Sequence, residues 1–284
     1  MLSRITHKTR YTYEGPVSHC LTEARLTPRL LPGQKLLEWQ LKVEPQPSAI
    51  TSRQDYFGND VSSFAVFDAH MELVITASGV VELRPPAETP HSPWTTSETR
   101  AYLASLAEPA ALRASEFTWE SPFVPWLAEL EAYSAPTLAP ERPVLEAAQA
   151  LMTQVYRDFA YTPKATSIET PLSVVMEKRQ GVCQDFAHVM IGALRAHGLA
   201  ARYVSGYLHN DAGFEGAGAS HAWVSVFAPG VGWVDYDPTN NVQPAQGHIT
   251  LALGRDFGDV TPVKGITVGG GAHTLEVDVR VVPA

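Results

Sequence analysis

Two stretches of the 284-residue chain decide its fold: residues 181–208, GVCQDFAHVMIGALRAHGLAARYVSGYL, and residues 220–241, SHAWVSVFAPGVGWVDYDPTNN. The first stretch begins with a segment that is apolar on most faces, which indicates a buried helix capped at its C-terminal end by Gly198. Alternating residues after this helix and in the second stretch predict β-strands. The sequence APGVG can join the last two strands as a hairpin. We therefore expect a central helix packed against an antiparallel sheet.

Cys183 follows Gly181 by two residues, at the predicted start of the central helix. A helix N-terminus favours the thiolate through its dipole and its free N–H groups, and the same N–H groups can donate to an oxyanion. Most cysteines, however, are small buried hydrophobes. Position alone therefore leaves two interpretations of Cys183 open, a nucleophile and a core residue.

His221 opens the strand that follows the Gly-rich loop. Alternation puts it on one face with Trp223 and puts the Ala and Val side chains on the other, core-facing side. Asp235 and Asp237 share a face of the next strand, although Asp-Pro-Thr-Asn-Asn also predicts a chain reversal. A hairpin would bring His221 and an aspartate together beside Cys183. A thiol nucleophile, its base and the carboxylate that orients the base have this arrangement.

The sequence of these segments resembles the transglutaminase-like superfamily, and most of all its bacterial branch, often labelled cysteine protease. The resemblance covers residues 145–262, the tail at residues 247–265 shares it, and the strand-rich start resembles the N-terminal β-domain that often precedes this core. It implies a papain-like α+β core. It also implies that the nucleophile of the G-x-C motif is Cys183, the histidine of the H-A-W motif is His221, and the aspartate of the D-P-T motif is Asp237.

One departure from the family concerns the oxyanion. Animal transglutaminases have a tryptophan after the nucleophile and another upstream that supports the oxyanion, whereas here Gln184 follows Cys183 and no tryptophan lies between Trp126 and Trp223. Our candidate oxyanion donor is the backbone N–H of Cys183. The Gln184 amide is a second candidate, with a capping or solvated amide as the alternative.

Three more residues are candidates for lining the site or binding substrate: His188, Trp223 and His248. Each also has a structural interpretation. His188 suits a packed core position, Trp223 suits aromatic packing in the hairpin, and His248 suits a local ion pair. We assign structural roles alone to Cys20, Asn59, Asp185 and His197.

Composition argues against several classes of partner. The chain has 21 Lys and Arg against 30 Asp and Glu, a net charge of −9, and no basic stripe, so we expect no nucleic-acid partner. No segment approaches the run of about 20 apolar residues that spans a bilayer. The first 15 residues lack the apolar centre of a signal peptide, which favours a cytoplasmic protein without a membrane partner. In a reducing compartment, Cys20 and Cys183 are expected to be separate thiols.

The pattern along the chain predicts three regions. Residues 1–86 contain short strands separated by turn signals, which is typical of a β-sandwich. The Pro-rich residues 84–94 mark a boundary, residues 87–142 read as a linker and helical segment, and residues 143–284 read as the α+β core with a C-terminal strand.

We expect thiol-dependent acyl transfer on a peptide or amide substrate, through a thioester that water resolves. Two alternatives stay open: transfer to an amine, as in protein-glutamine cross-linking, and a non-enzymatic binding module that docks through the β-domain. A metal site made of Cys183, His188 and His221 is a third class, but two distant cysteines do not give a zinc spacing. No calcium-loop pattern is visible either, so we expect no metal and no cofactor.

Overall fold

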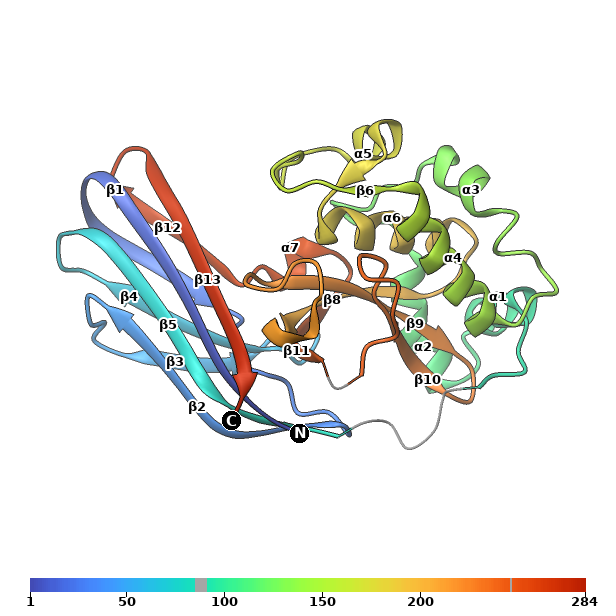
Figure 1. Cartoon of the computed structure of the whole chain (residues 1–284), viewed down its shortest axis with the longest axis horizontal. Helices are drawn as coiled ribbons and strands as arrows, with labels where there is room; N and C mark the ends of the chain where they lie inside the picture. Colours follow the sequence, from blue (N-terminus) through green and yellow to red (C-terminus); the bar gives the residue numbers. More distant parts are fainter. Residues whose placement is uncertain (85–90, 246) are drawn as a thin grey trace.

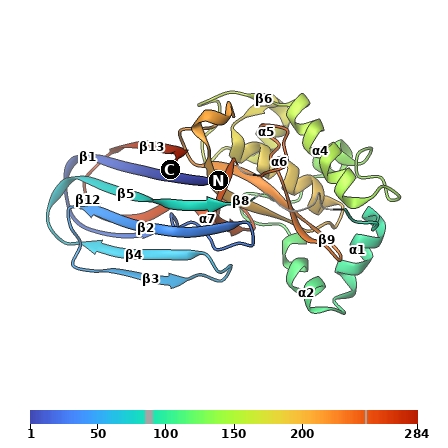
Figure 2. The same cartoon turned by 60° about the horizontal axis from the view of Figure 1, so that its bottom comes forward.

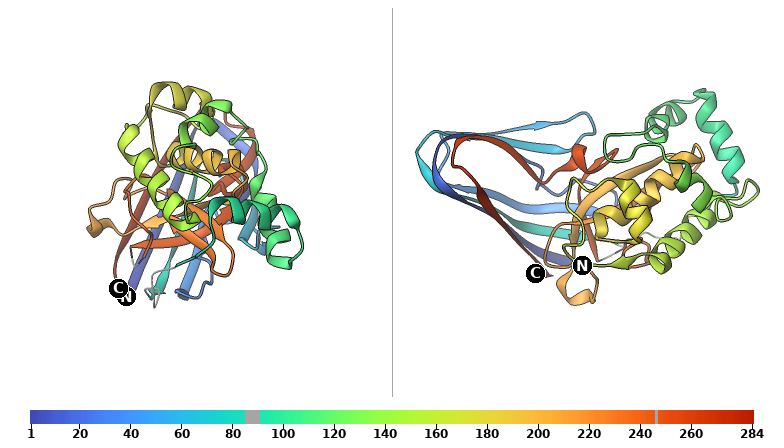
Figure 3. Two further views of the ribbon diagram at one scale, coloured as in Figure 1. Left: turned by 90° about the vertical axis from the view of Figure 1, so that its right-hand side faces the viewer. Right: turned by 90° about the horizontal axis from the view of Figure 1, so that it is seen from above.

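The computed structural model describes residues 1–84, 91–245 and 247–284. A curved β-domain forms one end of the molecule and a mixed α/β core forms the other (Figure 1). The two termini lie side by side, and the backbone N–H of Ala284 donates to the carbonyl of Leu2 at 3.1 Å (Figure 3). The expected boundary between residues 86 and 87 lies outside the described residues. Within those residues, no helix has both the length and the apolar character needed to cross a membrane.

Seven strands form the sheet of the N-terminal domain, and β1 runs through all of it. Their bounds are β1 Leu2–Ala24, β2 Gln34–Glu44, β3 Ile50–Gln54, β4 Asp60–Val66, β5 His70–Leu83, β12 Val263–Gly269 and β13 His273–Pro283. The first half of β1 pairs with β5 and β13, and its second half pairs with β4 and β12. β2 extends the sheet beyond β5, and β3 extends it beyond β4 (Figure 2). Side chains of both halves, such as Tyr13 and Phe64, share one apolar cluster, so the sheet encloses its own core.

The last two strands correct the predicted extent of the core. Residues 143–284 were expected to form the core together with a C-terminal strand, but β12 and β13 pair along β1, from Val263 opposite Ala24 to Pro283 opposite Ser3. Alternation identifies a strand without identifying its partner. The edge of β1 offers a long row of backbone groups that need partners, and the C-terminal strands supply them.

The core contains a four-stranded antiparallel sheet and a small two-stranded parallel one. The first has the order β10-β9-β8-β11, and the second pairs β6 with β7. Their bounds are β6 Ala160–Tyr161, β7 Gln180–Gly181, β8 Ala201–Leu208, β9 His221–Ala228, β10 Gly232–Tyr236 and β11 His248–Gly254. The predicted hairpin between β9 and β10 is confirmed, with Tyr236 opposite Val224.

Helices surround the predicted central helix, which is α6. Their bounds are α1 Thr96–Ser105, α2 Pro109–Ser115, α3 Ala128–Ser134, α4 Val144–Asp158, α5 Leu172–Lys178, α6 Cys183–Ala196 and α7 Phe257–Val260, with 3-10 turns at Glu116–Thr118 and Asn210–Ala212. α6 contacts β8 and β9 on one side and α3, α4 and α5 on the other (Figure 1). It is buried nearly all round, as its sequence predicts, and Gly198 follows it with φ of 73°.

The two domains share a core. Ile5, Val81 and Val281 of the β-domain belong to the same buried apolar cluster as Tyr207 and Ile249 of the core sheet. Burial of such side chains stabilises the association by about 25 cal/mol for each Å² of apolar surface removed from water. The β-domain is therefore packed into the core rather than tethered beside it.

Candidate active site

Cys183 is the first residue of α6, and the segment before the helix fixes its position. β7 pairs with β6, where the N–H of Thr162 donates to the carbonyl of Gly181 at 2.8 Å. The carboxylate of Asp185 accepts the N–H of Val182 at 2.8 Å and the hydroxyl of Thr166 at 2.6 Å. The thiol is partly exposed, whereas Cys20 is buried in the β-domain and the two do not form a disulfide.

His221 and Asp237 are in direct contact. Imidazole Nε2 of His221 lies 2.9 Å from Oδ2 of Asp237, and both side chains have no exposed surface. The hairpin explains the contact, because β9 starts at His221 and β10 ends one residue before Asp237. The N–H at Nε2 therefore points at a carboxylate oxygen, which fixes the plane of the ring.

The other ring nitrogen of His221, Nδ1, does not bond to Asp237. Nδ1 is buried and has no hydrogen-bond partner within the described residues. Burial disfavours the imidazolium, but the charges of Cys183 and Asp237 and the hydrogen bond to Asp237 outweigh it and raise the pKa of His221 to about 10. The arrangement favours an imidazolium that donates through Nε2 to a carboxylate.

Asp237 is held as a carboxylate by five donors. Oδ2 accepts from Nε2 of His221, Nε2 of His248 and Nδ2 of Asn240, and Oδ1 accepts from the backbone N–H groups of Thr239 and Asn240. Burial opposes ionisation, but these hydrogen bonds and the two histidines hold the pKa of Asp237 well below its usual range. The predicted chain reversal therefore also serves the site, since its backbone orients the carboxylate.

The structure places His248 in direct contact with Asp237, a contact that the sequence did not predict. Its Nε2 lies 3.0 Å from Oδ2 of Asp237, and its side chain is 3% exposed. Asp237 and His221 thus stand between His248 and Cys183. The donor atoms of His221, Asp237 and His248 lie within 4.8 Å of one another, a set that could in principle hold a metal. Both Nε2 atoms are at N–H···O distance from one oxygen, so hydrogen bonds already account for the arrangement.

Trp223 and Asp235 form a second pair beside the first. Indole Nε1 of Trp223 donates to Oδ2 of Asp235 at 3.1 Å, and the ring stacks on His221 and meets His248 edge-on. Trp223 is nearly fully buried, supports the two histidines, and with Asp235 and His248 also lines a cavity of about 440 Å³. A Cβ on Gly206 would lie 2.3 Å from this indole, so the absence of a side chain there lets the ring cross β8.

His188 lies apart from this cluster, in the aromatic core. It is 4% exposed, packs on Phe123 and Tyr203, and accepts the backbone N–H of Phe257 at 3.2 Å. Burial lowers the pKa of His188 to about 4, against an opposing contribution from Asp256. Its structural interpretation, as a neutral core histidine, therefore fits its surroundings.

The sequence did not predict two residues of this region, Tyr161 and Gly216. Burial, with Cys183 and Glu215 nearby, raises the pKa of Tyr161 to about 12, so its hydroxyl remains a donor at neutral pH. Gly216 covers the histidine: a Cβ there would lie 2.8 Å from Nδ1 of His221 and 3.6 Å from the Tyr161 hydroxyl, and its φ of 87° also favours glycine. No local signal marks Tyr161, because its pairing with Gly181 joins segments 20 residues apart.

Oxyanion donors are available at the start of α6. The N–H groups of Cys183 and Gln184 lie in the first turn, where no intrahelical acceptor exists. The Gln184 side chain is partly exposed on the same turn. Asn240 is a further residue that the sequence missed, although Asn next to an Asp-Pro turn is a known signal for side-chain to backbone bonding.

Comparison with known proteins gives matches to both parts of the chain. Residues 3–82 match the bacterial transglutaminase-like N-terminal region, and residues 131–238 match the transglutaminase-like superfamily. An uncharacterised protein of Mycobacterium tuberculosis is 35% identical over 99% of this chain and 92% of its own length. A protein-glutamine gamma-glutamyltransferase of Pseudomonas aeruginosa is 35% identical over 31% of this chain and 14% of that protein.

Among solved structures, a protein of Cytophaga hutchinsonii named "putative cysteine protease" has the same fold. It superposes with a TM-score of 0.77 at 18% identity and covers 99% of this chain and 90% of that protein. The likeness therefore includes the β-domain together with the core. With its central helix, its antiparallel sheet, and matches in both domains, the chain belongs to the transglutaminase-like superfamily.

Proposed function

We propose that this protein is a thiol-dependent acyltransferase that cleaves amide or peptide bonds, with Cys183 as nucleophile, His221 as acid and base, and Asp237 as the group that orients His221. The observation that carries the proposal is the buried imidazole of His221, bonded at Nε2 to a carboxylate, unpaired at Nδ1 within the described residues, and charged in part by the thiol of Cys183 at a helix N-terminus. Membership of a family that is generally enzymatic supports it.

The reaction begins with the ion pair. The Cys183 thiolate attacks the amide carbonyl, and the tetrahedral oxyanion accepts from the backbone N–H groups at the start of α6. The His221 imidazolium gives its Nδ1 proton to the leaving amine, the C–N bond breaks, and a thioester remains. Asp237 stays ionised throughout and keeps the Nε2 proton directed at itself.

The second half of the reaction resolves the thioester. Neutral His221 takes a proton from water, the hydroxide attacks the thioester carbonyl, and Cys183 leaves as the thiolate while the acid product departs. Tyr161 supplies a neutral hydroxyl near the thiol and is our side-chain candidate for the oxyanion, beside the amide of Gln184. Hydrolysis with these groups needs no cofactor.

Transfer to an amine is the second candidate. The Pseudomonas aeruginosa relative named as a protein-glutamine gamma-glutamyltransferase matches 31% of this chain at 35% identity. In that case a primary amine replaces water in the last step, and the rest of the chemistry is unchanged.

A generic acyl donor tests the proposal before the natural substrate is known. Wild type and Cys183→Ala are mixed with p-nitrophenyl acetate, alone or with cadaverine. We expect a burst of nitrophenolate and an acetyl group on the Cys183 peptide in wild type only, followed by free acetate or N-acetylcadaverine according to the preferred acceptor. Equal behaviour of wild type and Cys183→Ala, with equal thermal stability, would contradict the enzyme and support a binding module.

A further inference from the structure

β11 carries His248 at its start and is the edge strand of the four-stranded sheet in the described part of the chain. One side of β11 pairs with β8, where His248 lies opposite Leu208. Its other side faces the β-domain. The contacts on that side therefore decide how firmly the strand and its histidine are held.

Two side-chain amides of the β-domain complete the outer edge of β11. Nε2 of Gln34 donates to the carbonyl of Thr250 at 2.7 Å, and Oε1 accepts the N–H of Thr250 at 2.8 Å. Asn59 does the same with Leu253, both distances being 2.8 Å. A bulge after Thr250 shifts the register of β11, so that both residues turn outward although three positions separate them. Each side-chain amide thus donates one hydrogen bond to β11 and accepts one from it, as a residue of a neighbouring strand would do.

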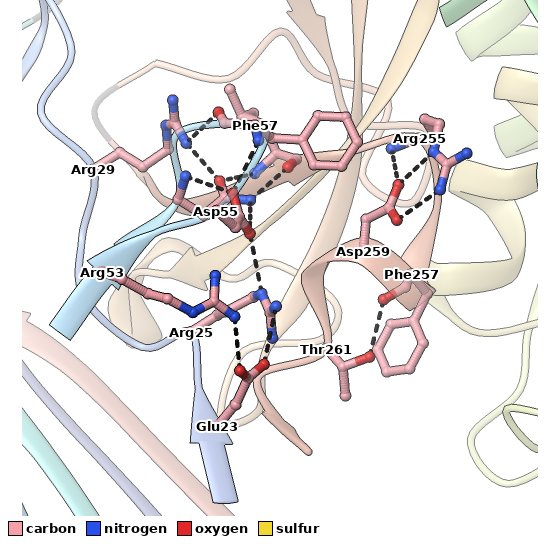
Figure 4. A network of polar contacts seen from close by, with 12 residues as sticks. Glu23, Arg25, Arg29, Arg53, Asp55, Phe57, Arg255, Phe257, Asp259 and Thr261 are labelled. Carbon is pink, nitrogen blue, oxygen red and sulfur yellow. Dashed lines mark hydrogen bonds and ion pairs between the residues drawn. The ribbon is translucent and has the colours of Figure 1, made fainter. Parts of the chain in front are cut away.

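The amides are themselves fixed. Asn59 is fully buried at the end of the β3–β4 turn, where the carboxylate of Asp55 accepts its backbone N–H at 2.9 Å. Arg25 donates to the same carboxylate at 3.2 Å, and Arg29 donates to the carbonyl of Phe57 (Figure 4). Buried polar networks with many hydrogen bonds are rigid, so these contacts of Gln34 and Asn59 hold β11 in one position.

The start of β11 is equally constrained at the site. The His248 ring lies between Phe214 and Trp223, each with its ring centre 5.2 Å away, and its Nε2 bonds to Asp237. His248 and His221 share Oδ2 of that carboxylate. Two imidazoles on one oxygen divide its hydrogen-bonding capacity, so the strength of the His221 bond depends on whether His248 is in place.

We propose that the β-domain takes part in the reaction by clamping β11 through Gln34 and Asn59, so that His248 acts as a positioning residue for Asp237. This inference rests on the proposed function, because it concerns the same carboxylate. His248 sets the orientation of the carboxylate and keeps it from binding the imidazolium too tightly, which preserves His221 as a proton donor to the leaving group.

The first experiment compares His248→Leu with His248→Gln, whose amide can donate from nearly the same place. We expect His248→Leu to lower kcat roughly tenfold with KM unchanged for an acyl anilide, whose leaving amine needs the His221 proton, and His248→Gln to restore most of it. The proton at Nε2 of His221 should move downfield in the NMR spectrum of His248→Leu, because Asp237 then serves one imidazole fewer. Wild-type kcat in His248→Leu, or an unmoved proton in the same variant, would overturn the inference.

The second experiment tests the clamp with Gln34→Ala, or Asn59→Ala if the first does not fold. We expect either variant to lower kcat in the wild-type background and to have no further effect in the His248→Leu background. Additive losses would overturn the role of the clamp.

The two levels of the proposal fail separately. Turnover that survives Cys183→Ala contradicts the proposed function. The NMR comparison of wild type with His248→Leu needs no turnover, and an unmoved His221 proton overturns the inference even in an active enzyme.

Discussion

His188 and His221 lie in two buried regions of the same core, and their environments drive them in opposite directions. His188 accepts a backbone N–H among aromatic rings, and burial lowers its pKa to about 4. His221 is equally buried, but Cys183 and Asp237 outweigh burial and raise its pKa to about 10. Burial alone therefore keeps a histidine neutral, whereas the charges of a nearby thiol and carboxylate favour the imidazolium of His221.

The largest expected difference between the two histidines is in enzymatic activity. His221→Gln should lower kcat by on the order of 10⁴-fold or more, because the thiol loses its base and the leaving group its acid. His188→Leu, the matched control on the other side of the core, should leave the turnover of folded protein within about tenfold of wild type. Acetyl-donor kinetics with active-site titration measure both, and equal losses in the two variants would contradict the separation of the two regions.

Asp237 and Asp235, two residues apart at the end of β10, allow a similar comparison. Asp237→Asn should cost roughly 10³- to 10⁴-fold in kcat, because an amide can donate to His221 and stabilise the wrong tautomer. Asp235→Asn keeps an acceptor for Trp223 and should cost less than about tenfold. Both should melt close to wild type, and a large loss of stability in Asp237→Asn would show that the carboxylate serves the fold instead.

The structural role of His188 appears in stability. His188→Leu leaves the N–H of Phe257 without its acceptor, which should cost about 1–3 kcal/mol of the free energy of unfolding. Urea titration of His188→Leu and His221→Gln at pH 7 checks this. A more stable His188→Leu would indicate that the hydrogen bond contributes nothing.

The acid dependence of stability gives a further comparison, between two neutral buried histidines. His188 and His7 both have folded-state pKa values of about 4, below the unfolded value of 6.5. The unfolded chain therefore binds more protons between pH 6.5 and 4, and the free energy of unfolding should fall as the pH drops through that window. Each histidine accounts for on the order of 3 kcal/mol. In His188→Leu the fall between pH 6.5 and 4 should be smaller, and an unchanged fall would contradict the assignment.

The sequence predicts the local parts of this structure well. The helix that begins at Cys183, the hairpin after His221 and the α+β core follow from periodicity and turn residues, and the family motif singles out Asp237 from Asp235. The structure shows why that choice matters, since Asp237 contacts His221 and Asp235 contacts Trp223. Periodicity could not make this choice, because both residues share a face.

The sequence did not predict the contacts between strands and between the two domains. His248 follows Asp237 by only 11 residues, yet it reaches the carboxylate from β11, on the far side of β8. β12 and β13 return to β1 more than 230 residues away. Asn59 was predicted as a turn residue, and its contact with Leu253 depends on how the domains pack. Strand patterns do not encode partners, so these features need the fold.

The most direct test of the central claim is the pH dependence of Cys183 alkylation by iodoacetamide. If His221 is an imidazolium beside a thiolate, Cys183 in the folded wild type should react at nearly the same rate at pH 6 and pH 8, while buried Cys20 stays unlabelled. In His221→Gln, which has no imidazolium to stabilise the thiolate, the rate should be roughly tenfold or more lower at pH 6 than at pH 8. A wild-type rate that falls as steeply as that of His221→Gln would contradict the ion pair and the mechanism built on it.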